Sequence, residues 1–187
     1  MPSNSAKLDD ACITDIEEDL DSFAVDPTRY ALLRRFSCGD REQRSQREVN
    51  QMVREYASGK RKRKDGTFRV TVERHGLVGV AAFQTATASQ PVLGRFTGSP
   101  YISVLGLTEQ YRGRKKAGRR LGDYILQDVL RAINERLGGT PDVFVLVNPT
   151  NTNGRSVFER NGFRMIVPAR NGGEFDALFR LSGRQVP

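Results

Sequence analysis

Apolar and polar positions follow two different periods along this chain. Between residues 68 and 72 they alternate one by one, and the apolar run 77–83 follows a turn that contains glycine, which predicts a β-hairpin. Across residues 119–137 apolar side chains recur every three or four positions, which predicts an amphipathic helix that ends at Gly138 and Gly139. The chain therefore contains both a strand pattern and a helix pattern.

The other periodic segments extend this mixed order. Further apolar runs predict strands at 29–37, 101–107, 142–147, 163–169 and 174–181. Helical spacing predicts helices at 41–57 and 152–161. Because the helix 119–137 lies between the strands 101–107 and 142–147, we expect a βαβ crossover. The predicted fold class is mixed α+β.

The first 26 residues, here called the leader, differ from the rest of the chain in charge. They carry eight acidic residues and one lysine, which gives a net charge of −7. Because the whole chain has a net charge of +8, residues 27–187 have a net charge of +15. Four apolar leader residues recur at helical spacing: Ile13, Ile16, Leu20 and Phe23. The sequence therefore predicts an acidic leader over 1–26, either a docked helix or a tail, and one domain over 27–187.

Composition narrows the class of protein. The two cysteines, Cys12 and Cys38, do not form a disulfide framework, which favours a cytoplasmic protein, and Cys38 is interpreted as a small packed side chain. The single histidine, His75, lies in a predicted turn, so no metal site is expected. No apolar run is long enough to span a membrane. The basic run 60–64 predicts a solvated loop, or a contact with nucleic-acid phosphates.

The positive charge is concentrated in LGLTEQYRGRKKAGRRLGDYIL, residues 105–126. A strand that enters a glycine-containing loop and then a helix gathers backbone N–H groups at one place, which suits phosphate. Gly113 and Gly118 allow close approach of the backbone. The residues after Gly118 are Arg119 and Arg120, so the lysine and hydroxyl of an ATPase phosphate loop are missing. The sequence therefore predicts an anion site of another kind.

Two segments resemble the signatures of the GNAT acetyltransferases. LGLTEQYRGRKKAGRRL resembles their acyl-CoA-binding motif, and NTNGRSVFERNGF (151–163) resembles their second signature. The resemblance covers about residues 28–181 and implies the GNAT fold, a splayed mixed central sheet flanked by helices, with acetyl-CoA as cofactor. The cofactor-binding residues that it implies are Leu105, Gly106, Leu107, Arg112, Gly113, Arg114, Lys115, Lys116, Ala117, Gly118, Arg119, Asn151 and Phe158.

The resemblance also assigns roles to these residues. The backbone of 105–107 would bind the pantetheine arm, the N–H groups of 112–118 the pyrophosphate, and Asn151 would face the cofactor, a role compatible with capping a helix. Two positions depart from the family pattern. The spacing from Arg112 to Gly118 is six residues instead of five, and Phe158 stands where many members carry a tyrosine as general acid. No catalytic residue is therefore assigned. Tyr101 and Ser103 are only weak candidates to replace the missing tyrosine as proton donor.

A third segment, FSCGD…VNQMVREYA (36–57), resembles the Phe-x-Cys-Gly…Asn opening of GNAT toxins that acetylate aminoacyl-tRNA, with about six more residues between Cys38 and Asn50. The expected function is acetyl transfer from acetyl-CoA to an amine, by direct attack in a ternary complex. The acceptor is a small molecule, a peptide α-amine or aminoacyl-tRNA. Two alternatives are a GNAT toxin that acetylates aminoacyl-tRNA and a GNAT-fold protein that binds CoA or RNA without catalysis. The sequence does not determine the oligomeric state, and a homodimer is one possibility.

Overall fold

The computed structural model describes residues 15–16, 19–39, 44–60, 66–73, 76–85, 98–168 and 176–180. Within them, seven strands form one sheet in the order β1-β2-β3-β4-β7-β9-β8, and a small hairpin of β5 and β6 stands apart from it. The strands are β1 (Asp21–Ala24), β2 (Gly66–Glu73), β3 (Gly76–Gln84), β4 (Tyr101–Leu107), β5 (Lys115–Lys116), β6 (Arg119–Arg120), β7 (Val143–Val147), β8 (Arg164–Val167) and β9 (Asp176–Arg180). All pairs in the large sheet are antiparallel except β4 with β7, which are parallel.

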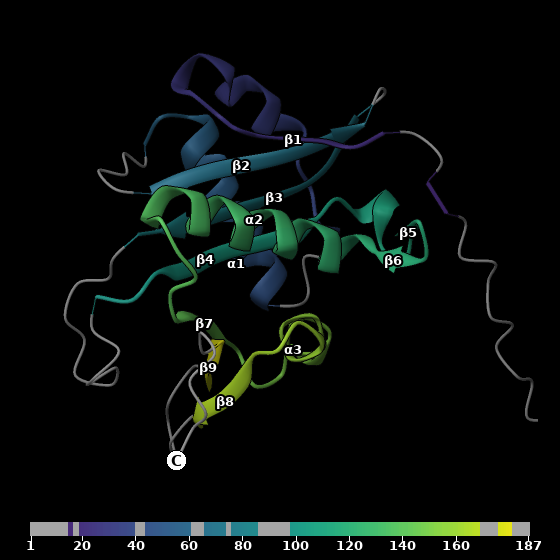
Figure 1. The fold of residues 1–187 in the computed structure, drawn as a ribbon. Coiled ribbons are helices and arrows are strands. Elements are labelled where there is room, and N and C mark those ends of the chain that lie inside the picture. The colour runs from purple at the N-terminus through teal and green to yellow at the C-terminus, as the bar shows by residue number, and fades with distance from the viewer. Residues whose placement is uncertain are drawn as a thin grey trace, which may run out of the picture.

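Helices cover both faces of this sheet (Figure 1). They are α1 (Arg44–Ala57), α2 (Leu121–Leu137) and α3 (Thr152–Arg160), with short 3-10 helices η1 (Pro27–Arg35) and η3 (Glu109–Tyr111). The helix α2 connects the parallel strands β4 and β7, as the sequence predicts for a βαβ crossover. The structure thus confirms the mixed α+β class and the central mixed sheet.

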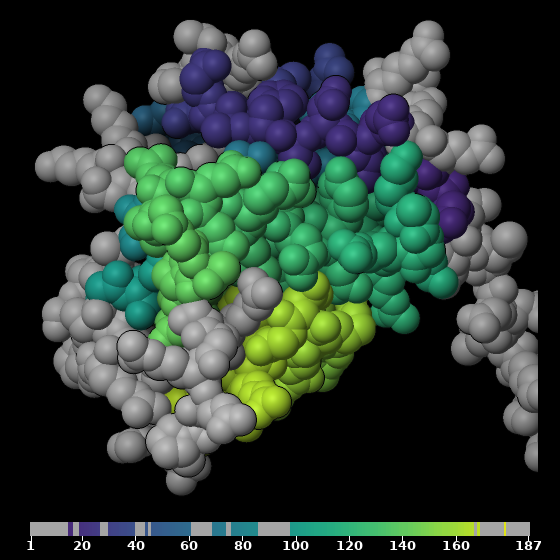
Figure 2. Space-filling model, viewed as in Figure 1, coloured from purple at the N-terminus to yellow at the C-terminus, as the bar shows by residue number. Residues whose placement is uncertain are grey.

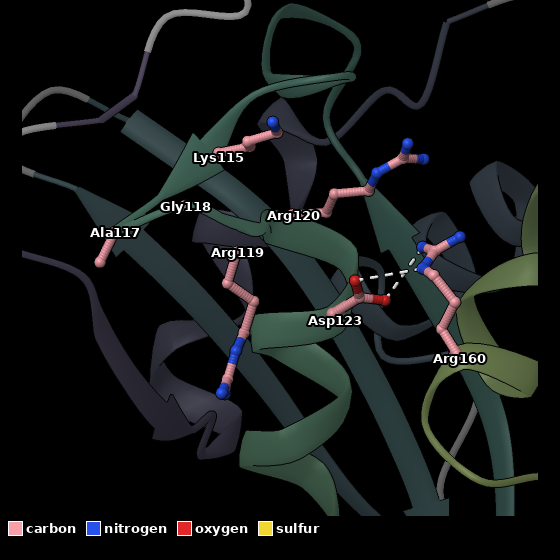
Figure 3. A pocket seen from close by; sticks show the side chains of 7 residues that line it. All are labelled: Lys115, Ala117, Gly118, Arg119, Arg120, Asp123 and Arg160. Atoms are coloured by element: carbon pink, nitrogen blue, oxygen red, sulfur yellow. Dashed lines mark hydrogen bonds and ion pairs between the residues drawn. The ribbon is translucent and has the colours of Figure 1, made fainter.

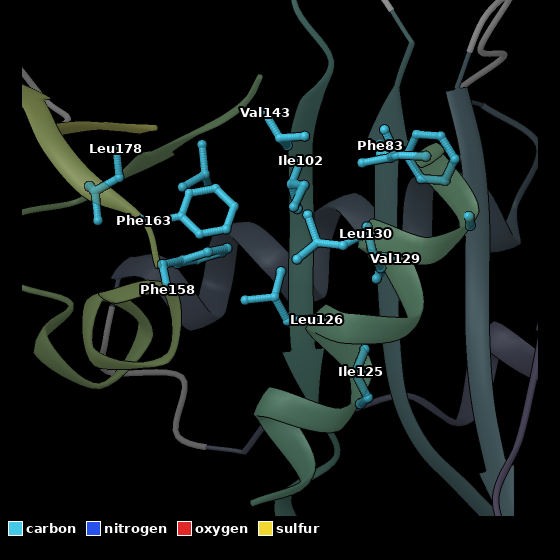
Figure 4. Packing of buried hydrophobic residues seen from close by; sticks show 14 of the residues in the cluster. Phe83, Ile102, Ile125, Leu126, Val129, Leu130, Val143, Phe158, Phe163 and Leu178 are labelled. Atoms are coloured by element: carbon cyan, nitrogen blue, oxygen red, sulfur yellow. The ribbon is translucent and has the colours of Figure 1, made fainter. Parts of the chain in front are cut away.

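Each face of the sheet has its own hydrophobic core. On one face, α2 and α3 pack on the sheet in a core that includes Leu126, Leu130 and Phe158 of these helices and Phe163, which precedes β8 (Figure 4). On the other face, α1 and η1 pack on Val80, Val104 and their neighbours. Single-residue alternation in β3 supplies both cores, because successive side chains of a strand point to opposite faces.

Two described segments differ from their predicted structure: residues 21–24 of the leader and the first predicted strand. Asp21–Ala24 form β1, which pairs with the edge of β2, because a neighbouring strand edge offers hydrogen bonds that isolated helical spacing does not. Residues 29–37 were expected as a strand but lie largely in η1. Tyr30, Leu33 and Phe36 are spaced by three, the period of a 3-10 helix, and Leu33 is fully buried.

The remaining elements appear close to their predicted positions, with ends shifted by a few residues. The helix α2 begins at Leu121, two residues later than expected. The expectations for Cys12, Ile13, His75 and the basic run after Lys60 lie outside the described residues. Within the described residues, no helix is long and apolar enough to cross a membrane.

A buried ion pair joins the leader, the sheet and α2. The Arg69 guanidinium donates to both oxygens of the Asp128 carboxylate at 2.7 and 3.1 Å and to the Ser22 carbonyl at 3.2 Å. The side chain of Asp128 is 7% exposed and that of Arg69 is 17% exposed. The fork geometry satisfies both charges, so neither partner is easily removed alone.

We expect Asp128→Ala to lower the free energy of unfolding by about 3 kcal/mol, because Arg69 is left partly buried without its counter-ion. Urea unfolding of the two proteins measures the difference. Glu48→Ala is the control, since Glu48 pairs with Arg44 at 2.8 Å on the surface and should cost less than about 1 kcal/mol. Equal losses in both variants would contradict a special role of the buried pair.

Candidate functional site

The open edge of β4 is the first part of the candidate site. In the described chain β4 pairs with β7 only at Tyr101 and Ile102, whereas its other side stays paired with β3 as far as Leu107. A register shift leaves Ser103 as an extra residue opposite β3, which makes a β-bulge where the sheet parts. Beyond this point the sheet splays, as the resemblance implied, and exposes a strand edge to which an extended ligand can bond.

Alternation along β4 determines which backbone groups face this edge. The Thr108 N–H donates to β3 at 2.9 Å, so by alternation Gly106 also bonds toward β3, while Leu105 and Leu107 direct their N–H and C=O groups to the open side. A Cβ at Gly106 would lie 3.0 Å from Cζ of Phe36. Gly106 therefore serves close packing, and two of the three expected backbone positions can bond a ligand.

The loop after β4 begins at a buried tyrosine. Tyr111 is 3% exposed and donates its hydroxyl hydrogen to the Glu73 carboxylate. The Arg114 guanidinium lies 5.4 Å from the centre of the Tyr111 ring, within the range of a cation–π contact. These contacts attach the start of the loop to the end of β2.

The loop then folds into the β5–β6 hairpin. Ala117 and Gly118 have φ angles of +49° and +73°, the left-handed pair typical of a two-residue hairpin turn. The Leu121 N–H donates to the Arg114 carbonyl at 3.1 Å and closes the base of the hairpin. The helix was expected from residue 119, directly after Gly118, whereas Gly118 lies in this turn and the helix begins at Leu121. The six-residue spacing from Arg112 to Gly118 provides the length that the hairpin needs.

A basic pocket of about 580 Å³ lies between the hairpin and the start of α2 (Figure 3). Its lining residues are Lys115, Ala117, Gly118, Arg119, Arg120, Asp123 and Arg160. Four of the seven are cationic. The one carboxylate, Asp123, pairs with Arg160 at 3.0 Å, which leaves a positive excess for an anionic ligand. Arg120 provides no side-chain cap for α2, so the positive end of that helix adds to the field.

The open edge of β4 and this pocket are adjacent. A Cβ at Gly122 would lie 3.9 Å from Cδ1 of Leu107, the last residue of β4, and 3.3 Å from Cγ2 of Val157 on α3. Gly122 immediately precedes Asp123 of the pocket. The end of β4 and the start of α2 therefore lie next to each other.

The structure gathers only part of the expected site around the pocket. Lys115, Ala117, Gly118 and Arg119 line it, and the predicted site residues did not include the other three lining residues, Arg120, Asp123 and Arg160. Arg160 comes from α3 and no motif links it to the loop. The side chains of Arg114 and Lys116 point elsewhere: Arg114 lies over Tyr111, and Lys116 forms an ion pair with Asp19 of the leader. Arg112 and Gly113 precede the hairpin and do not line the pocket.

Asn151 and Phe158 have structural contacts. The Asn151 side chain accepts a hydrogen bond from the Gly154 N–H at 3.0 Å and caps α3. Phe158 is 5% exposed and packs edge-to-face on Phe163 with ring centres 5.2 Å apart. Of the two weak candidates for its missing hydroxyl, Ser103 donates to the Ala82 carbonyl and Tyr101 stacks on the ring of Phe144.

Cys38 and Asn50 form one buried unit. The Asn50 Oδ1 accepts from the Cys38 N–H at 3.0 Å and from its thiol at 3.3 Å. Burial raises the pKa of the Cys38 thiol, partly offset by the Arg112 charge, so the thiol stays protonated. Cys38 is thus the small packed side chain that the sequence predicts. In the described part of the chain, no group of three or more His, Cys, Asp or Glu side chains could hold a metal ion.

No known family model and no curated protein sequence matches this chain. Solved structures do. A GNAT-family protein from Desulfovibrio desulfuricans is 17% identical, with a TM-score of 0.59 over 86% of this chain and 96% of the other. PaiA N-acetyltransferase from Thermoplasma acidophilum, solved with coenzyme A, is 12% identical, with a TM-score of 0.55 over 88% and 99%. The toxin AtaT, solved with the C-terminus of its antitoxin AtaR, is 17% identical, with a TM-score of 0.55 over 87% and 91%. This chain has the GNAT fold.

Proposed function

We propose that this GNAT-fold chain binds acetyl-CoA and transfers the acetyl group to an amine. The observation that supports this most is the continuity of two features: a strand edge free to bond an extended arm, and a four-cation pocket beside its end. An amide-containing arm joined to a diphosphate matches both. A free nucleotide would use the pocket and leave the strand edge of β4 without a partner.

The residues present fit this ligand. Backbone groups of Leu105 and Leu107 would bond the pantetheine arm, and Lys115, Arg119 and Arg120 would hold the diphosphate. Acetyl-CoA supplies an activated acyl group as a thioester. N–H groups on the β4 edge would stabilise negative charge that develops on the carbonyl oxygen as the amine attacks.

The reaction also requires two proton transfers. The new C–N bond forms as the C–S bond breaks, so the nitrogen loses a proton and the leaving thiolate gains one. Phe158 has no hydroxyl to give, and Ser103 already donates to a backbone carbonyl. No residue is assigned as the base either, so we propose that the acceptor arrives as a neutral amine, which favours amines of low pKa.

The test is release of free CoA thiol with a panel of amines, combined with calorimetric titration of CoA. Thiol release that depends on both acetyl-CoA and an amine supports the transferase. CoA binding without thiol release in the presence of any amine would favour the non-catalytic alternative. That alternative is motivated by Phe158, which stands where many GNAT members carry a tyrosine. Absence of CoA binding at millimolar concentration would remove both.

Aminoacyl-tRNA is the macromolecular acceptor that fits best as an alternative. Its α-amine has a low pKa, and the Cys38–Asn50 unit is formed from the residues that resemble the toxin opening. Similarity to AtaT is consistent with this reading. Acetylation of charged tRNA, with binding that weakens steeply as salt rises, would separate this function from transfer to a small amine.

A further inference from the structure

The acidic leader lies on the hairpin of the candidate site. The Ile16 N–H donates to the Lys115 carbonyl at 2.7 Å, and Asp15 pairs with Lys115 in a parallel bridge beside β5. Ile16 is 7% exposed and packs in a cluster with Tyr111 and Leu121. Figure 2 shows the purple leader against the teal surface of this region. The buried side chain of Ile16 thus holds the leader against the β5–β6 hairpin.

Two leader carboxylates contact the β5–β6 hairpin, and one of them, Asp15, contacts a residue that lines the pocket. The Asp15 Oδ2 accepts from the Gly118 N–H at 3.3 Å. The Asp19 Oδ1 lies 3.7 Å from the Lys116 Nζ, and the Asp19 side chain is fully exposed. The N–H of Gly118 is among the groups expected to bind a diphosphate, and it cannot be fully donated to a carboxylate and a phosphate oxygen at once.

We infer that the leader is a built-in competitor for the diphosphate of the ligand, with Asp15 occupying the Gly118 N–H in the docked state. The identity of that ligand as CoA rests on the proposed function, whereas the competition itself concerns any diphosphate. Docking lowers the apparent affinity in proportion to the fraction of molecules with the leader in place. The contact is easily reversed, because Asp15 is exposed and its hydrogen bond is long.

Point variants test this better than truncation, since residues 21–24 form β1 and Val25 is buried. Asp15→Asn keeps the shape and removes the charge, and Asp15→Ala removes the acceptor. Glu135→Gln is the matched control. It makes the same change in net charge on an exposed residue of α2, about 20 Å along the helix from its start. Calorimetry with inorganic pyrophosphate, CoA and pantetheine, which lacks the diphosphate, gives three affinities for each protein.

We expect both Asp15 variants to bind pyrophosphate and CoA about three- to tenfold more tightly than the wild type, with pantetheine binding and the Glu135→Gln protein unchanged. Wild-type affinity for CoA in both Asp15 variants would overturn the competition and leave the proposed function standing. Tighter pyrophosphate binding with no CoA binding would support the competition and remove CoA as the ligand. Absence of binding to any of the three probes would reject both.

Discussion

Gly118→Asp is expected to abolish the rise in melting temperature that acetyl-CoA gives the wild type. A Cβ at Gly118 would meet nothing within 4 Å, so there is space for the side chain, although its φ of +73° strains any residue other than glycine. Two unit charges of like sign about 4 Å apart cost about 4 kcal/mol at an effective dielectric of 20, less with salt screening. The expected loss of affinity for the diphosphate is therefore on the order of 10²–10³-fold.

Gly118→Asn is the control that isolates charge from shape. Asp and Asn are similar in size, and both tolerate the left-handed conformation of this turn better than other residues. Thermal unfolding with and without millimolar acetyl-CoA should show a shift for Asn and none for Asp. If the two variants keep equal shifts, the diphosphate lies away from the hairpin turn.

A peptide α-amine is expected to be acetylated roughly 350-fold faster than a lysine side chain at pH 7. An amine of pKa about 10.4 is about 0.04% neutral at that pH, and one of about 7.8 is about 14% neutral. A protein base would reduce this difference, and the expectation takes as its premise that no such base has been assigned. The neutral fraction of the acceptor then sets the rate.

The measurement compares a peptide with a free N-terminus and an N-blocked lysine peptide from pH 6.5 to 9.5. The lysine rate should rise about tenfold per pH unit throughout, whereas the α-amine rate should level off near pH 8. Faster lysine acetylation at pH 7, or a lysine rate that does not change with pH, would show that a base acts on the acceptor.

The framework of the fold was predictable because its signals are local. The alternation in β2 and β3, the helical period of α2 and the two apolar strands around it each specify an element without knowledge of its neighbours. The leader was not predictable in this way. Ile16, Leu20 and Phe23 fit a helix by spacing, but Phe23 pairs with Val70 on the edge of β2, a contact 47 residues away that no local pattern contains.

The candidate site likewise has a part that local sequence signals predicted and a part that depends on long-range contacts. Its glycines and cations between 113 and 119 stand together in the sequence, so their spacing indicated a phosphate loop. The hairpin itself was missed because the two positive φ angles at Ala117 and Gly118 give the loop a turn of its own, and alanine rarely indicates such a turn. Arg160 and Asp123 meet across 37 residues through the packing of α3 on α2, and that packing has no motif.

The splay of the sheet also has a mechanical consequence. Strands β1 to β4 and strands β7 to β9 form two half-sheets that share two residue pairs, Tyr101 with Phe144 and Ile102 with Val145. Few backbone hydrogen bonds cross this seam, so the side-chain core under α2 is the main link between the two halves. We expect amide exchange to report on the two halves separately. A ligand bonded along β4 fills the gap as an additional strand would. Binding would then join two units of local unfolding into one, and substrate occupancy would set how cooperatively the molecule unfolds.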